Sequence, residues 1–155
     1  MTDTSRTFTG FAELRTCIDL LAKLRHDVAR MSEDQGDAYA AFDFFVTAEH
    51  MVDWYLPNDK PAQHELRASE VLLQITSHLA NGAKHFKVKD KRHKSVRAVS
   101  NEAYADSDYT ESGYFANEIE ITLSEAESSA LSSEKIDALA LAYRVYEYWR
   151  TQLNQ

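Results

Sequence analysis

Polar side chains that can move protons or bind anions gather on two predicted helices. His50 and Asp53 lie three residues apart within an aromatic stretch, so both belong to one face of a helix. On a later helix Asn81, Lys84 and His85 place an amide, an ammonium and an imidazole close together. An imidazole exchanges a proton near neutral pH, and an ammonium attracts phosphate. His85 beside the charge of Lys84 is therefore a candidate for proton transfer or for binding an anion.

A wider polar stripe joins these residues on the later helix. Gln74, His78, Asn81 and His85 recur at helical spacing and so line one flank. If this helix packs antiparallel to the helix of His50, the two polar flanks meet. The expected binding pocket contains His50, Asp53, Trp54, His78, Asn81 and His85, with Lys84 at its rim.

The same side chains also have a purely structural interpretation. Half-buried His and Asn side chains often only bond backbone carbonyls or cap a neighbouring helix. Metal binding would use imidazole and carboxylate ligands, but the sequence contains no HxxxH, no ExxH and no paired cysteines. It also lacks a Gly-rich phosphate loop. We therefore expect neither a metal nor another cofactor, and we interpret Cys17 as a small core residue.

Length and composition limit the class of protein. A chain of 155 residues that is 44% hydrophobic can form one globular domain, residues 1–155. Its four Gly and two Pro favour long regular elements. The single cysteine excludes an internal disulfide and favours a reducing compartment. The sequence shows neither a signal peptide nor an apolar run long enough for a membrane span, so we expect a cytoplasmic protein without membrane contact.

Charge is distributed unevenly along a chain whose net charge is −8. Basic residues concentrate between residues 84 and 97, whereas residues 98–134 contain acids but no Lys or Arg. The two segments of opposite sign can simply pair with each other. Alternatively, the basic segment forms a strip for RNA or a protein partner. Beyond Lys84, the expected strip consists of Lys87, Lys89, Lys91, Arg92, Lys94 and Arg97.

Hydrophobic periodicity predicts three helices before residue 87. The first spans residues 9–31, with Thr9 as its N-cap and apolar residues at three-to-four spacing from Phe11 to Val28. The second spans residues 37–56 after an Asp37 cap, and it is apolar around most of its circumference, as a central helix would be. The third spans residues 65–86, after Pro61, and contains Gly82, which we interpret as a close contact between helices or an approaching helix end.

The second half predicts a β element and a closing helix. Residues 86–99 alternate like a half-solvated strand pair, residues 101–117 form a loop, and residues 118–123 form a strand. A turn after Ser124 leads to a short return strand, and Ser132 and Ser133 are candidate caps for a helix that ends near Leu153. The prediction is a mainly α fold: a four-helix bundle (8–86 and 132–153) with a small β hairpin and loop (87–131) inserted before the last helix.

Three segments carry a resemblance to known proteins. AEHMVDWYL (48–56) and SHLANGAKHF (77–86), followed by the aromatic-rich YRVYEYWRTQL, resemble a family of small bacterial and phage-associated helical proteins. More distantly, the arrangement looks like the HEPN superfamily, whose active members are metal-independent RNases that use an Arg, a polar residue and a His. Aligning Asn81 and His85 with the last two puts Ala80 at the Arg position. Lys84 or Arg67 would then have to supply the missing positive charge.

The resemblance and the polar residues together suggest three functions. The first is a non-catalytic, HEPN-like interaction or RNA-associated module in phage defence or a toxin–antitoxin system. The second is a metal-independent RNase with His85 as acid or base and Lys84 at the phosphate. The third is a bundle that binds a small molecule or metal through His50, Asp53, His78 and His85. The HEPN resemblance also implies a homodimer.

Overall fold

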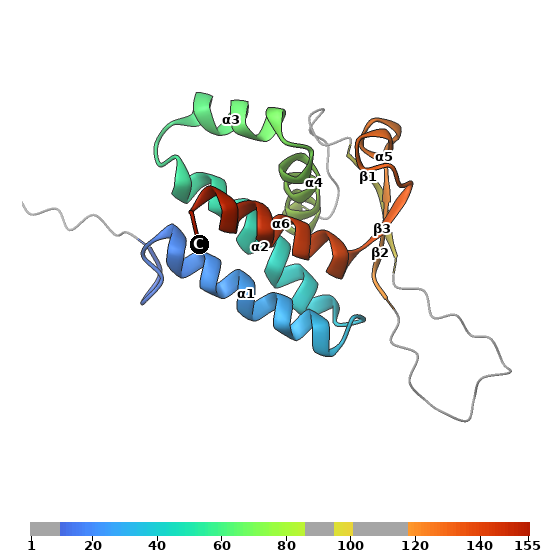
Figure 1. Cartoon of the computed structure of the whole chain (residues 1–155), viewed down its shortest axis with the longest axis horizontal. Helices are drawn as coiled ribbons and strands as arrows, with labels where there is room; N and C mark the ends of the chain where they lie inside the picture. The colour runs from blue at the N-terminus through green and yellow to red at the C-terminus, as the bar shows by residue number, and fades with distance from the viewer. Residues whose placement is uncertain (1–9, 86–94, 101–117) are drawn as a thin grey trace, which may run out of the picture.

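The computed structural model describes residues 10–85, 95–100 and 118–155 (Figure 1). These residues form a mainly α structure with a small antiparallel sheet, which confirms the predicted class. The elements are α1 (Cys17–Glu33), α2 (Ala38–Tyr55), α3 (Lys60–Ser69), α4 (Val71–His85), β1 (Val96–Ser100), β2 (Glu120–Leu123), α5 (Glu125–Leu131), β3 (Lys135–Asp137) and α6 (Ala138–Gln152).

The first helix, α1, begins later than its periodicity indicated. Thr16 caps it: its hydroxyl accepts a hydrogen bond from the amide of Asp19 at 3.2 Å, and the Asp19 carboxylate accepts one from the Thr16 amide at 2.9 Å. Upstream, Phe11 and Leu14 exchange two backbone hydrogen bonds of 2.8 Å, which close a tight turn. Phe11 is 70% exposed, so its predicted place in the helix core is wrong. Thr9 lies outside the described residues.

The second helix, α2, is central, as its sequence predicted. Asp37 caps it by accepting a hydrogen bond from the Ala40 amide at 3.0 Å. The helix packs against α1, α3, α4 and α6, which explains why so much of its circumference is apolar. Its buried residues are Ala40, Ala41, Phe44, Phe45, Thr47, Ala48, Met51 and Val52.

The predicted third helix is two helices. It breaks at Glu70, whose backbone is extended (φ −128°, ψ 114°), and α3 and α4 run in clearly different directions in Figure 1. Side chains satisfy the backbone at the break: the Ser69 hydroxyl donates to Leu66 O at 2.9 Å, and the Gln74 amide donates to Ala68 O at 2.7 Å. Such local bonds compete with a continuous helix, and periodicity alone does not reveal them.

A three-stranded sheet replaces the predicted hairpin. Its strand order is β1-β2-β3, and both pairings are antiparallel. Val96 pairs with Leu123 and Ala98 with Thr122, so the register shifts between them and Arg97 sits at a β-bulge. The part of the predicted strand pair before residue 95 lies outside the described residues.

The connection from β2 to the last helix also differs from the prediction. The expected turn is the helix α5, and the return strand β3 follows it. Ser132 ends α5 in the left-handed region (φ 55°) rather than beginning α6. Asp137 is the true cap of α6, since its carboxylate accepts a hydrogen bond from the Ala140 amide at 2.8 Å. The serines at 132 and 133 were therefore assigned to the wrong helix.

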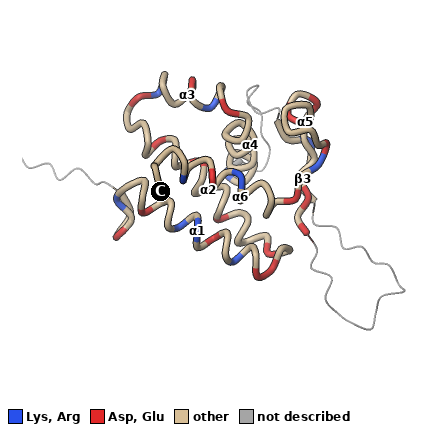
Figure 2. The backbone as a smooth tube through the Cα atoms, viewed as in Figure 1, with Lys and Arg blue, Asp and Glu red and all other residues tan. Residues whose placement is uncertain are grey.

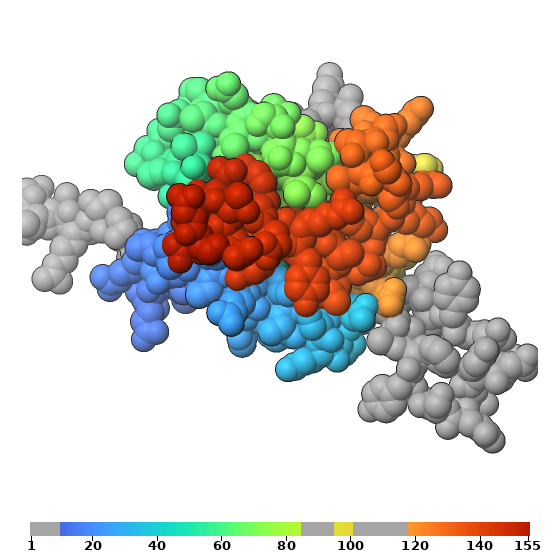
Figure 3. Space-filling view, viewed as in Figure 1, coloured from blue at the N-terminus to red at the C-terminus, as the bar shows by residue number. Residues whose placement is uncertain are grey.

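Buried side chains from the helices and the sheet form one hydrophobic cluster. Its largest member is Trp149 of α6, which is fully buried beside Tyr55 of α2, with ring centroids 5.6 Å apart. Figure 3 shows α6 lying between α1 on one side and the α3–α4 pair on the other. In the part of the chain that the structure describes, we find no helix with the length and hydrophobicity required for a membrane span.

Candidate functional site

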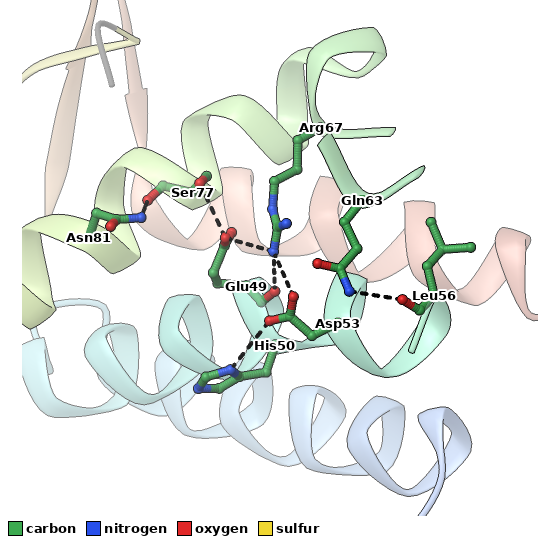
Figure 4. A network of polar contacts seen from close by, with 8 residues as sticks. All are labelled: Glu49, His50, Asp53, Leu56, Gln63, Arg67, Ser77 and Asn81. Atoms are coloured by element: carbon green, nitrogen blue, oxygen red, sulfur yellow. Dashed lines mark hydrogen bonds and ion pairs between the residues drawn. The ribbon is translucent and has the colours of Figure 1, made fainter. Parts of the chain in front are cut away.

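The described members of the predicted pocket do not come together in the structure. On α2, the Nδ1 atom of His50 lies 3.9 Å from the Asp53 carboxylate, and the two side chains are 59% and 45% exposed. Figure 4 shows His50 pointing away from α4, where Ser77 and Asn81 lie. The Asn81 amide donates to the Ser77 carbonyl of its own helix at 2.8 Å. The two predicted flanks therefore do not meet.

Three other residues of the predicted pocket, His78, Trp54 and Lys84, lie in different parts of the structure. The Nδ1 atom of His78 accepts a hydrogen bond from the Val96 amide at 2.9 Å, so His78 faces β1 rather than the polar side of α2. Trp54 is half-buried against the hydrophobic core. Lys84 is exposed near the end of α4, and the side chain of His85 lies outside the described part of the structure.

A helical rotation explains why the stripe on α4 misses α2. Consecutive residues of a helix are rotated by about 100°. Ser77, rather than His78, is turned toward α2, where its hydroxyl donates to Glu49 at 3.2 Å. The predicted polar flank of α4 exists, but Ser77 contacts α2 where the prediction had His78, one residue later in the chain.

A polar network joins α2, α3 and α4 where the pocket was expected (Figure 4). The Arg67 guanidinium of α3 lies 2.9 Å from the Glu49 carboxylate and 3.5 Å from the Asp53 carboxylate. It also donates to the Glu49 carbonyl at 3.3 Å. Burial raises the pKa of Glu49, although the Arg67 charge and the Ser77 hydrogen bond act in the opposite direction.

This network connects helices to one another, which is a structural role. Arg67 is engaged by two carboxylates and a carbonyl of α2, so its charge is compensated within this network. Charge pairs that are mostly removed from water mainly fix the relative positions of the elements that hold them. Here they fix α3 against α2.

A cavity of about 450 Å³ lies on another side of α4. It opens between α2, α4, the strands β1 and β2, and the start of α6. Most of its wall is apolar, and several lining residues are small, which leaves space between the elements. The lining includes Ala41, Phe42 and Phe45 of α2, Leu79, Gly82 and Ala83 of α4, Val96 and Val99 of β1, Ile119, Ile121 of β2 and Ala138 of α6. Gly82 therefore lines a cavity, and apart from this glycine no sequence pattern indicated that cavity.

Two polar contacts hold β1 in place as the wall of this cavity. On one side, His78 of α4 binds the Val96 amide. On the other, the Ser95 hydroxyl donates to the Glu127 carboxylate of α5 at 2.8 Å, and the Ser124 hydroxyl donates to the same carboxylate. Sequence reasoning missed Glu127 because its partner Ser95 is distant in the chain.

The electrostatics of Glu127 differ from those of Glu49. Burial pushes the pKa of Glu127 upward, but the hydrogen bonds from Ser124 and Ser95, and the neighbouring His78, together lower it below its ordinary value. A carboxylate in such surroundings stays ionised and keeps accepting both hydroxyls. The start of β1 is thus anchored by an ionised acceptor.

Several predicted features involve residues that the structure does not describe. Of the basic strip, Arg97 is described and exposed, whereas Lys87, Lys89, Lys91, Arg92 and Lys94 lie outside the described residues. Along the described helices, acidic and basic residues are interspersed, as α1 and α3 show in Figure 2. Within residues 10–85, 95–100 and 118–155, no three His, Cys, Asp or Glu side chains form a group suited to a metal ion.

Comparisons with models of protein families, with curated proteins and with solved structures find no match to this chain.

Proposed function

We propose that this protein binds a small, largely apolar molecule in the cavity between α2, α4 and the sheet. The observation that carries the proposal is the cavity itself: about 450 Å³, with mostly apolar walls and a few polar groups. Binding sites for small molecules are typically concave, mostly apolar and about 300–1,000 Å³ in volume. This corresponds to the small-molecule alternative from the sequence, at a different place in the fold.

The walls are suited to binding without a large rearrangement. Phe45 and Ile121 belong to the hydrophobic core, and β1 is held by His78 and Glu127. A ligand chain that leaves water for such a cavity gains about 0.8 kcal/mol per buried methylene. A preformed wall also reduces the entropy that binding would otherwise lose in ordering the protein.

Binding of decanol to the full-length protein, measured by calorimetry and thermal unfolding, tests this proposal. Ala83→Leu adds bulk to the wall from α4 and should weaken decanol binding at least tenfold, since each 1.4 kcal/mol changes affinity about tenfold. Ala22→Leu makes the same chemical change at an exposed position of α1, away from the cavity, and should leave binding unchanged. Absence of binding, or equal affinity in Ala83→Leu and the native protein, would exclude the cavity as the site.

A second function, RNA association, is favoured by one observation. Lys84 and Arg97 are both exposed, and in the sequence they flank residues 86–94, which contain five more Lys and Arg. A basic strip binds phosphates by releasing counterions, so its affinity falls steeply with salt. Lys84→Glu with Arg97→Glu should weaken RNA binding and reduce its dependence on salt, and unchanged binding with an unchanged salt dependence would contradict a role for these two residues.

The catalytic form of this second function has its own test. An RNase that uses His85 should lose about 10²–10⁴-fold of its rate in His85→Ala. Cleavage that survives this substitution would exclude His85 as acid or base. Binding without cleavage would instead favour the interaction module.

A further inference from the structure

The cavity wall includes a charged residue for which the described part of the chain provides no partner. This residue is Arg97, the one arginine among the described residues that line the cavity. Elsewhere in the described chain, Arg30, Arg67 and Arg150 each pair with a carboxylate, whereas the exposed Arg25 and Arg144 do not, so the missing partner of Arg97 matters because of its place at the cavity. The exposed side chain of Arg97 has no such partner, since no hydrogen bond or ion pair of this side chain is found.

The backbone at Arg97 is also irregular. The register of β1 against β2 shifts between Val96 and Ala98, so Arg97 occupies a β-bulge. Bulges redirect a side chain from the regular alternation of a strand, and they are common beside binding sites. This geometry and the unpaired charge are independent observations at the same residue.

We infer that the molecule bound in the cavity is an amphiphilic monoanion, a medium-length alkyl chain with a terminal carboxylate that Arg97 engages. The inference rests on the proposed binding function and names its ligand class. The apolar wall suits the alkyl chain, and the planar guanidinium suits a carboxylate, which it can bind through two parallel hydrogen bonds.

Charge limits the ligand to a single negative group. Arg97 is the one Lys or Arg among the described residues that line the cavity. One arginine neutralises one carboxylate, whereas a dianionic phosphate would keep an uncompensated charge at the mouth of an apolar cavity. A monocarboxylate is therefore favoured over a phosphate ester.

Decanoate and decanol separate the role of the charge from that of the alkyl chain. Both are titrated into the full-length native protein and into Arg97→Gln, Arg97→Lys and Arg25→Gln, below the concentration at which decanoate aggregates. Arg97→Gln should weaken decanoate about three- to tenfold and leave decanol unchanged, and Arg97→Lys should restore part of the decanoate affinity. Arg25 is an exposed residue of α1, so Arg25→Gln removes the same charge away from the cavity and should preserve both affinities.

The outcomes distinguish this inference from the function on which it rests. If Arg97→Gln changes neither ligand, or weakens both equally, Arg97 does not recognise the carboxylate, although the cavity still binds alkyl chains. If the native protein binds neither ligand, the proposed function itself is wrong. Unchanged decanol affinity in Arg97→Gln also shows that the variant keeps its fold.

Discussion

At the scale of single residues, two largely buried carboxylates respond to folding in opposite ways. Glu127 accepts hydrogen bonds from two serine hydroxyls, and its pKa is lowered even though burial opposes this. Glu49 is paired with Arg67, yet burial is its largest influence and its pKa is raised. The neighbouring charges differ: the Asp53 carboxylate raises the pKa of Glu49 further, whereas the charge of His78 helps the two serine hydrogen bonds to lower that of Glu127.

The lowered pKa of Glu127 makes its contribution to stability depend on pH. A group whose pKa is lower in the folded state stabilises the fold above its unfolded pKa, and this stability is lost as pH falls through the folded value. Glu127→Gln should therefore cost about 1–3 kcal/mol of unfolding free energy at pH 7, and this cost should shrink progressively as pH falls below 4.5. Urea unfolding of both proteins across this range measures the difference.

A matched control for this substitution exists in the same helix. Glu125 is exposed in the first turn of α5, so Glu125→Gln should change the free energy of unfolding by about 0.5 kcal/mol or less. Equal effects of the two substitutions would mean that the serine hydrogen bonds do not stabilise the start of β1.

The raised pKa of Glu49 predicts the opposite dependence. A group whose pKa is higher in the folded state stabilises the fold below its unfolded pKa, near 4.5, and that stability is lost as pH rises through the folded value. Relative to Glu49→Gln, the native protein should therefore lose unfolding free energy as pH rises from 4.5. Urea unfolding of both proteins from pH 4 to 7 shows the trend. A native protein that gains stability over this range would mean that Arg67 outweighs burial.

At the scale of elements, the hydrogen bond from Val96 to His78 ties β1 to α4. His78→Phe keeps a ring but removes the acceptor, so it should cost about 1 kcal/mol of stability. The amide of Val96 should then exchange with solvent markedly faster, while amides of α1 such as that of Leu24 keep their rates, because α1 packs mainly against α2 and α6. Exchange followed by NMR checks this. An unchanged rate at Val96 would show that pairing with β2 and the anchor at Ser95 suffice.

At the scale of the whole molecule, one core joins the helices to the sheet. Trp149 of α6 contacts Tyr55 of α2, and β2 contributes Ile121 and Leu123 to the same cluster. We expect a single cooperative unfolding transition, as for most domains of this size. In Trp54→Phe, tryptophan fluorescence reports Trp149, and its midpoint in urea should coincide with that of far-UV circular dichroism. Two separate midpoints would instead divide the chain into independently folding units.

The sequence by itself determined the helical class, the central place of α2 and the Asp37 cap. These three features depend on residues that are close together in the chain, so local patterns such as hydrophobic spacing predict them. The break at Glu70 and the late start of α1 were missed, because side-chain bonds to nearby backbone override the hydrophobic period there.

Only the tertiary structure decided which polar side chains meet. A rotation of about 100° per residue turned Ser77 toward Glu49 and His78 toward β1. The anchor of β1 joins Ser95 to Glu127, far apart in sequence, and the cavity is space left between elements. Neither contacts between distant segments nor empty space have a local signature in a single sequence, because both are set by how the elements pack.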